Sequence, residues 1–163
     1  MHITSYEKKG IKLSIARQNN TLLAISFSPF KNQYLPTLLA KTSVSFSGKN
    51  AEALEKQLDA YFSGKIVEFS AQMELHGTEF QRAVWQACAK IPHGETRTYG
   101  ELAKAIGNPK AVRAVGLALG QNPIPIIIPC HRVIGKNGKL TGFAGGLDVK
   151  QALLKLEKQE FKK

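Results

Sequence analysis

Cysteine is scarce in this sequence: only Cys88 and Cys130 occur in 163 residues. They lie far apart, and no Cys-x-x-Cys pair exists. The chain therefore lacks the disulfide framework of a small secreted domain and the ligand spacing of a zinc site. We expect a reducing compartment, the cytoplasm, and no bound metal.

Long apolar runs are also missing. No stretch approaches the roughly 20 residues that span a bilayer, so no contact with a membrane is expected. Residues 1–7 lack the apolar core of a signal peptide. The apolar content of 43% and the charged content of 21% are typical of a soluble globular protein with enough residues to bury a core.

Acidic residues are few, with 12 Asp and Glu against 23 Lys and Arg, a formal net charge of +11. The excess is uneven: residues 1–75 carry nine basic and six acidic residues, and residues 76–163 carry fourteen and six. A strongly basic half suggests a polyanionic partner such as nucleic acid. A basic surface that serves solubility alone is the alternative.

Residues 1–75 predict a small α/β domain. Residues 11–17 and 22–28 read as two strands joined by a hairpin turn, and the alternation around Val44 and Phe46 suggests a third. Asn50 is a candidate cap for a helix over residues 51–62, and residues 66–69 look extended. No catalytic group of residues stands out here.

Residues 76–163 predict a second, mainly helical domain. Capping boxes at residues 78–81 and 98–101 mark the starts of two helices, the second ending at Gly107. Cys88 lies on the apolar face of the first helix, where we interpret it as a packing residue. Asn108 and Pro109 predict a third helix over residues 109–119.

The last two of these helices have the spacing of a helix-turn-helix. The helix over 109–119 carries Lys110 and Arg113 on a face of small residues, which would allow close approach to a backbone or a narrow groove. That face comprises Ala111, Ala114, Gly116 and Ala118. A surface arginine without a special role is the plain alternative for Arg113.

The chain is organised around residues 126–134, where two apolar runs flank Pro129, Cys130, His131 and Arg132. A nucleophile, a titratable base and a fixed cation interrupt an otherwise buried run. Pro129 favours extended backbone at Ile128 and stiffens the chain that presents Cys130. A cysteine that only packs is the alternative. Direct contact between adjacent Cys130 and His131 side chains is disfavoured, so His131 would act through a water or across a tight turn.

Beyond this stretch, residues 135–139 predict a basic turn resembling the wing of a winged helix. Residues 142–146 form a glycine-rich segment with one aromatic residue, Phe143, suited to closing over a pocket. An amphipathic helix over residues 147–161 completes the domain and carries Glu157, for which a surface carboxylate is the plain alternative.

The second half resembles the O6-alkylguanine-DNA alkyltransferases, also called methylated-DNA–protein-cysteine methyltransferases. The similarity covers about residues 76–160, and the run from Pro129 to Val133 after an Arg-Ala-Val-Gly helix is specific to the family. The other matching segments, in order, are residues 77–81, 84–85, 91–96, 98–99, 102–103, 113–116, 122–123, 145–147, 153–154 and 157.

The resemblance implies a winged helix-turn-helix and assigns roles to particular residues. Cys130 would accept the alkyl group, His131 would act as base through a water, Glu157 would orient His131, and Asn122 would brace the turn before the active-site strand. The remaining roles concern DNA and the flipped base. Arg113 would fill the gap in the duplex, Tyr99 would contact the phosphate and the base, and the backbone near Cys130 and Val133 would accept from the guanine amine. Phe143 and Ala144 would wall the pocket, with Lys110 and Thr98 at the DNA surface.

The implied reaction is single-turnover repair of O6-alkylguanine, with O4-alkylthymine as a further candidate, after minor-groove binding and base flipping. No cofactor is implied, and the protein would act as a monomer on double-stranded DNA, with cooperative assembly left open. Phe143 stands where many members have tyrosine, and Ala144 where serine is common. The N-terminal zinc-binding cysteines of some relatives are absent.

Two other classes of function compete with repair. A lesion-binding or regulatory winged-helix protein would account for the charge and the helices but would leave Cys130, His131 and Glu157 without a task. A thiol hydrolase or redox enzyme would use the cysteine but fits the basic half and Arg113 poorly.

Overall fold

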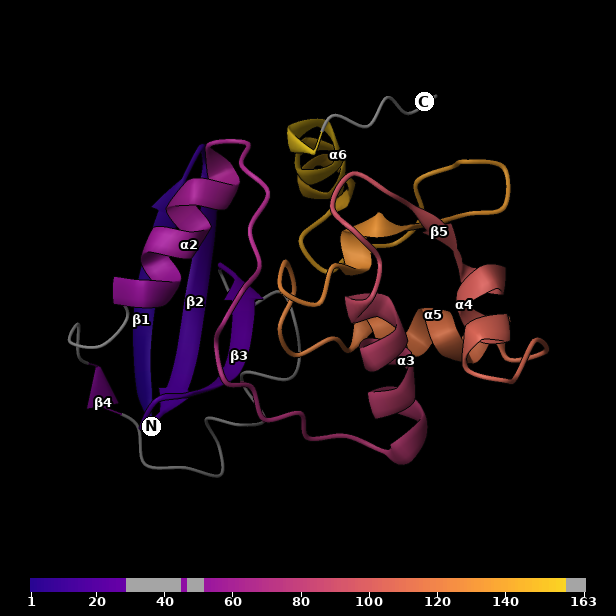
Figure 1. The fold of residues 1–163 in the computed structure, drawn as a ribbon, viewed down its shortest axis with the longest axis horizontal. Helices are drawn as coiled ribbons and strands as arrows, with labels where there is room; N and C mark the ends of the chain where they lie inside the picture. The colour runs from indigo at the N-terminus through magenta and orange to yellow at the C-terminus, as the bar shows by residue number, and fades with distance from the viewer. Residues whose placement is uncertain (29–44, 47–51, 158–163) are drawn as a thin grey trace. The chain divides into compact units, whose positions relative to one another are not determined.

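The computed structural model divides the chain into two compact units, Met1–Leu75 and His76–Lys163. It describes residues 1–28, 45–46 and 52–157. Each unit is considered separately below, and Figure 1 shows the elements of both.

The first unit is built on a sheet with the strand order β3-β2-β1-β4. β1 (His2–Lys8), β2 (Ile11–Gln18) and β3 (Thr21–Phe27) pair antiparallel, and β4 (Ser45–Phe46) pairs parallel with β1. The predicted hairpin of β2 and β3 is confirmed, with Asn19 at the turn in the left-handed region (φ 55°). β1 was not predicted, because its buried residues Ile3 and Tyr6 are three positions apart instead of two.

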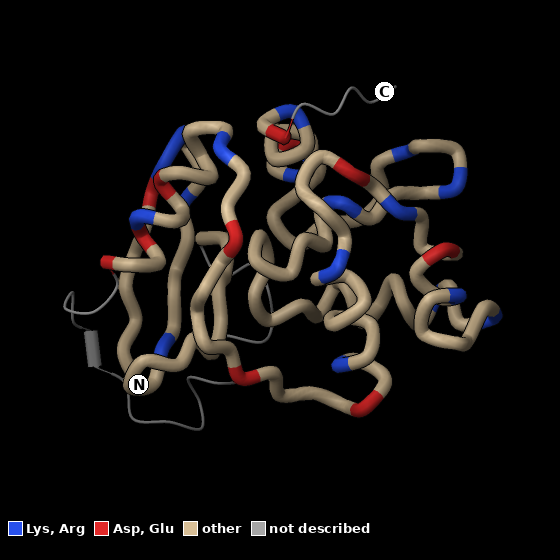
Figure 2. Tube along the Cα trace, in the orientation of Figure 1, with Lys and Arg blue, Asp and Glu red and all other residues tan. Residues whose placement is uncertain are grey.

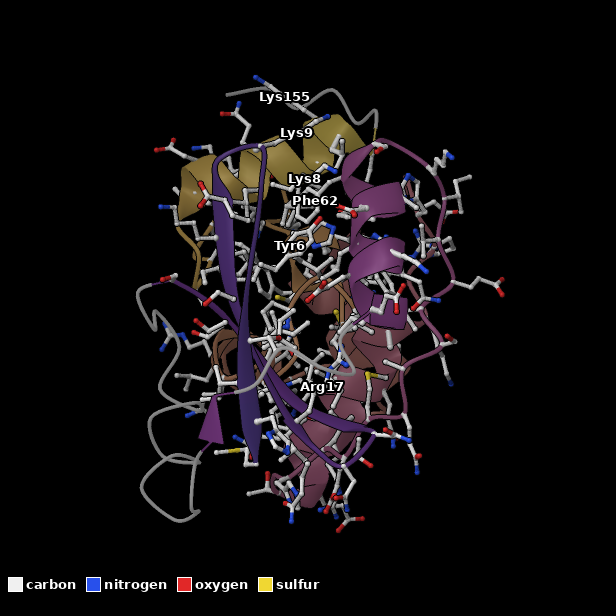
Figure 3. The ribbon with its side chains drawn as sticks, turned by 90° about the vertical axis from the view of Figure 1, so that its left-hand side faces the viewer. Tyr6, Lys8, Lys9, Arg17, Phe62 and Lys155 are labelled. Atoms are coloured by element: carbon white, nitrogen blue, oxygen red, sulfur yellow. The ribbon has the colours of Figure 1, made fainter. Side chains whose placement is uncertain are left out.

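Helix α2 (Glu52–Phe62) lies beside this sheet and buries its apolar face. Figure 3 shows Phe62 of α2 near Tyr6 of β1, and their rings stack with centroids 5.9 Å apart. The Tyr6 hydroxyl donates to Asp59 at 2.9 Å, so polar and apolar contacts join the helix to the sheet. The predicted cap at Asn50 and the residue Val44 lie outside the described residues. Residues 66–69 do not join the sheet, and the chain next pairs at Met73, with Leu22.

The second unit contains the helices α3 (Glu79–Ala89), α4 (Tyr99–Ala105) and α5 (Val112–Gly120), which pack against one another. Both predicted capping boxes are present, Thr78 with Gln81 and Thr98 with Glu101. The buried indole of Trp85 donates to the carbonyl of Ala118 at 2.8 Å and ties α3 to α5. Among the described residues, no helix is both long and apolar enough to cross a membrane.

The predicted start of α5 is wrong. Helix α4 ends just before Gly107, which has a left-handed backbone (φ 75°). The N–H groups of Gly107 and Asn108 donate to the carbonyls of Lys104 and Ala103. The chain then forms a turn in which the Ala111 N–H donates to the Asn108 carbonyl at 3.0 Å. Pro109 occupies the second position of that turn, where its fixed φ is favoured, so the helix begins only at Val112.

The end of the chain completes the second unit. A single 3₁₀ turn, η1 (Cys130–Arg132), leads into β6 (Val133–Ile134), which pairs parallel with β5 (Arg97–Thr98). Helix α6 (Leu147–Leu156) packs against η1. The part of the predicted final helix beyond residue 157 lies outside the described residues.

Candidate active site

Cys130 is presented by a tight turn, where the sequence suggested a strand. Pro129 has φ −81° and ψ 62°, and the Cys130 N–H donates to the Ile128 carbonyl at 2.8 Å, the geometry of an inverse γ-turn. The Arg132 N–H then donates to the Pro129 carbonyl at 2.8 Å and closes η1. The ring of Pro129 therefore stiffens this backbone, as expected, but by fixing a turn.

Asn122 holds the loop that precedes this turn. Its side-chain amide donates to the Ile128 carbonyl at 2.8 Å, and its Oδ1 accepts from the Ile124 N–H at 3.0 Å. Within the loop Ile126 has φ 76°, a left-handed conformation that is strained for a β-branched residue. Asn122 and Ile126 are both buried, so side-chain contacts fix a backbone that the local sequence alone would not adopt.

Cys130 is 7% exposed, and its thiol lies among hydrogen-bond donors. Burial raises its pKa, while hydrogen bonds from Asn122 and from the backbone N–H groups of Cys130 and His131, together with the charge of Lys150, act to lower it. The net pKa is raised, so the resting group is a protonated thiol. A base is therefore needed to form the thiolate, and the donors would then stabilise it.

His131 and Glu157 form a buried pair, with Nε2 of the imidazole 2.8 Å from Oε1 of the carboxylate. Burial lowers the pKa of His131 more than Glu157 raises it, so the imidazole is neutral at pH 7. Burial alone would raise the pKa of Glu157, but its bonds to His131 and Arg132 bring it well below its usual range. An ionised Glu157 accepts a hydrogen bond from Nε2–H, which makes Nδ1 the basic nitrogen of the imidazole.

Arg132 belongs to this group although the sequence assigned it no role. Its Nε and Nη2 donate to the two oxygens of Glu157 at 2.8 and 2.9 Å, and its Nη1 donates to the Ile91 carbonyl at 2.6 Å. The Gly94 N–H also donates to Glu157, at 3.2 Å. Glu157 is therefore a buried and fully bonded carboxylate, and the alternative of a plain surface carboxylate is wrong.

Lys150 is the second residue that the sequence did not single out. It is fully buried on α6, and its Nζ donates to the carbonyls of Val133 at 2.6 Å and Thr141 at 2.9 Å. Burial lowers the pKa of Lys150 to about 8. The signal was its spacing: residues 150, 153, 154 and 157 form one buried face of α6, with a charged residue at each end.

Two of the predicted base-binding residues, Tyr99 and Val133, lie next to Lys150. Tyr99 exchanges hydrogen bonds with Thr141, and its ring centroid lies 5.9 Å from the Lys150 Nζ. The Val133 carbonyl, expected to accept from guanine, already accepts from Lys150. Phe143 and Ala144 are half-buried in the segment that follows Thr141. The structure thus brings Tyr99, Val133 and Thr141, the residue before the glycine-rich segment, together around Lys150.

Two of the predicted DNA-contacting residues, Lys110 and Arg113, are exposed, unlike this buried group. Arg113 is exposed in the first turn of α5, Lys110 is exposed in the turn before it, and Thr98 caps α4 with its side chain. Basic residues lie on the turn of residues 135–139, closed by a hydrogen bond from Gly135 to Lys139, and on the connection between α4 and α5 (Figure 2).

The predicted small-residue face of α5 is only partly correct. Ala118 is buried, and Gly116 lies against the Tyr99 ring. Lys110 precedes the helix instead of lying on it. The exposed face of the helix includes larger apolar residues and comprises Val112, Arg113, Ala114, Leu117 and Gly120.

Both cysteines are free, and Cys88 is fully buried, as predicted for a packing residue. Burial raises its pKa well above the ordinary value, which makes it a poor nucleophile. Within the described part of the chain, no cluster of three or more His, Cys, Asp or Glu could hold a metal ion.

Residues 79–159 match the family model described as the DNA-binding domain of 6-O-methylguanine DNA methyltransferase. A Methanosarcina mazei protein named methylated-DNA–protein-cysteine methyltransferase is 63% identical over 109 residues, 67% of this chain and 69% of that protein. The chain belongs to the methylated-DNA–protein-cysteine methyltransferase family. This confirms the resemblance inferred from the segment around Cys130.

Other members extend the comparison. A Methanosarcina acetivorans protein of the same name is 66% identical over 102 residues, and the match spans 63% of this chain and 65% of that relative. The structure of Mycobacterium tuberculosis OGT in complex with DNA is 43% identical, with a TM-score of 0.87 over 97% of this chain and 93% of that one. A Methanococcus jannaschii O6-methylguanine DNA methyltransferase, 29% identical, has a TM-score of 0.68 over 98% and 96% of the two chains.

Proposed function

We propose that this protein repairs DNA by transferring an alkyl group from O6 of guanine to Sγ of Cys130, once per molecule. The observation that carries the proposal is the arrangement around the thiol. Cys130 is buried and receives hydrogen bonds from Asn122 and from the backbone of η1. The neighbouring His131 is neutral and is oriented by Glu157 at the end of α6. The DNA complex of the Mycobacterium tuberculosis relative supports duplex DNA as the partner.

The proposed step is an in-line displacement at the alkyl carbon. The thiol proton passes through a water to Nδ1 of His131, and the thiolate forms an S–C bond as the C–O6 bond breaks. The departing guanine takes a proton from Tyr99, and the proton that His131 accepted then returns through water to the tyrosinate, so guanine gains one proton and His131 and Tyr99 end as they began. The product is a thioether that no second nucleophile in this site removes, and the protein therefore acts once and without a cofactor.

The alkylated base must leave the DNA duplex before the protein can reach it. The alkylated oxygen lies within the base stack, and Cys130 is buried, so the nucleotide must turn out of the duplex to meet the thiol. We propose that α4 and α5 act as a helix-turn-helix on the minor groove, with residues 135–139 as the wing. Arg113 would fill the vacated position in the duplex, and Phe143 and Ala144 would close on the base.

Intact mass spectrometry tests the reaction. Incubation with a duplex that carries one O6-methylguanine should add one methyl group to the protein, saturate at one per molecule and map to the peptide that contains Cys130. Cys130→Ala should bind the same duplex but gain no mass. Binding of the lesion by the wild type without any gain in mass would favour the lesion-sensor function instead.

Arg113→Ala tests the DNA part of the proposal separately. We expect repair of duplex DNA to slow by at least about tenfold, while the reaction with the free modified base is unchanged, because the free base needs no extrusion. Equal losses with both substrates would show that Arg113 supports the fold or the pocket and not the duplex.

A further inference from the structure

We propose that Arg132 is a positioning residue that keeps His131 in the neutral, base-competent form by neutralising and fixing Glu157. The inference rests on the proposed function only in taking His131 as the base. It comes from the contacts of Arg132, which the repair mechanism above does not use.

The geometry is that of a planar fork on a carboxylate. Nε and Nη2 of Arg132 donate to the two different oxygens of Glu157, at 2.8 and 2.9 Å, and Nη1 is anchored on the Ile91 carbonyl at 2.6 Å. The Arg132 side chain is 11% exposed and that of Glu157 is fully buried. Because both oxygens are held, the carboxylate has one orientation, and its Oε1 faces His131 at 2.8 Å.

The charges around His131 explain why this matters. Glu157 at the end of α6 favours the imidazolium, whereas Arg132 in η1 and Lys150 on α6 oppose it. The thiol of Cys130 lies on the same turn, Cys88 faces the group from α3, and His93 lies in the loop whose Gly94 contacts Glu157. A buried carboxylate with no counter-charge would hold a proton on its histidine partner. With Arg132 present, the carboxylate orients His131 without protonating it, and Nδ1 can act as the base that takes the thiol proton.

The test compares the wild type with Arg132→Met, which removes the charge and the fork but keeps a long side chain. NMR titration of the His131 imidazole should show its midpoint raised by at least about one pH unit, tenfold in proton affinity. The rate at which iodoacetamide alkylates Cys130, mapped by peptide mass, should fall roughly tenfold at pH 7 and recover at higher pH. The control is Arg97→Met, which breaks an exposed ion pair with Glu95 in the same unit and should change neither readout.

Arg132→Lys separates charge from geometry and keeps the test available if Arg132→Met does not fold. The lysine retains the positive charge, so the His131 midpoint should stay within about half a unit, but it cannot form the fork, so alkylation should slow roughly tenfold. A variant indistinguishable from the wild type in both readouts would overturn the role of the fork.

Two results with Arg132→Met would overturn the proposal: an unchanged or lowered His131 midpoint, or faster alkylation at pH 7. The second would mean that an imidazolium–thiolate pair, rather than a neutral base, is the reactive form. Neither readout uses methylated DNA. Failure of methyl transfer by the wild type would therefore refute the proposed function and leave the His131 titration to decide this inference.

Discussion

The side-chain amide of Asn122 donates a hydrogen bond of 2.8 Å to the carbonyl of Ile128, six residues further along the chain. With the bond that its Oδ1 accepts from Ile124, it spans the loop that delivers Cys130. The position of Cys130 therefore depends on a residue that lies outside the segment of residues 126–134.

Asn122→Ala should destabilise the protein by about 2 kcal/mol, since it leaves the buried Ile124 N–H without its partner and removes one of the two hydrogen bonds that the Ile128 carbonyl accepts. It should also slow alkylation of Cys130, because the same amide stabilises the thiolate. Urea unfolding and iodoacetamide kinetics measure the two effects. Gln121→Ala is the matched control, because Gln121 is the exposed neighbour of Asn122 and its side chain accepts a hydrogen bond from Gln81. Its free energy of unfolding should change by no more than about 0.5 kcal/mol.

Glu157→Gln should destabilise the protein by about 3 kcal/mol at pH 7, because the charge of Arg132 then lies buried without its partner. The folded pKa of Glu157 is depressed, so its contribution is complete above the ordinary value of 4.5 and is lost as pH falls below it. The difference in free energy of unfolding between the wild type and the variant should be about 2 kcal/mol smaller at pH 3 than at pH 7. Urea unfolding from pH 3 to 7 measures this, and a gap independent of pH would contradict an ionised Glu157 in the fold.

Lys150→Met should reveal the cost of a buried ammonium group. The folded pKa of Lys150, about 8, lies below its ordinary value of 10.5, so the folded protein releases this proton first as pH rises. Between pH 8 and pH 10 the free energy of unfolding of the wild type should therefore rise by about 2 kcal/mol relative to that of the variant. Differential urea unfolding provides the measurement. Lys155→Met, at an exposed position of the same helix, should show no such gain.

Leu117→Ala should weaken binding to duplex DNA. Leu117 is 70% exposed on α5, one turn after Arg113, where an apolar side chain would contact sugars in the minor groove. We expect a loss of roughly threefold to tenfold in affinity with an unchanged slope of log Kd against log salt. Lys110→Ala should instead reduce that slope by about one, as for a lost phosphate contact. Fluorescence anisotropy over a salt series distinguishes them.

The control for Leu117 is Leu147→Ala, which removes an exposed leucine from α6. It should bind DNA like the wild type. Equal losses in the two leucine variants would indicate a general effect of lost apolar surface and not a contact made by α5.

Local chemistry made some features predictable and long-range packing hid others. Thr78 and Thr98 start helices through bonds to residues three positions away, so short sequence patterns revealed both. Pro109 fits the first turn of a helix and the second position of a β-turn equally well. The β-turn forms here because the N–H groups of Gly107 and Asn108 bond back to α4 and end that helix just before Pro109.

The residues of the candidate site also fall into those that the sequence revealed and those that it did not. Cys130 and His131 stood out because they interrupt an otherwise buried apolar run, whereas the role of Glu157 came only from the match to a family. Arg132 and Lys150 were missed because a basic residue in a basic chain predicts an exposed side chain, and their burial depends on partners 25 and 17 residues away. For Lys150 a local sign existed, since it continues the buried face of Leu153 and Leu154.

The burial of Cys130 also bears on how long the unreacted protein survives. Peroxide oxidation and exchange with disulfides both require an accessible thiolate, and this thiol is protonated and 7% exposed. On the proposed function Cys130 reacts once in the life of a molecule, and its burial slows reaction with the oxidants and electrophiles of the cell. On the proposed function, the cell's repair capacity then follows the number of protein molecules made and the number of lesions met, with little lost to side reactions during storage.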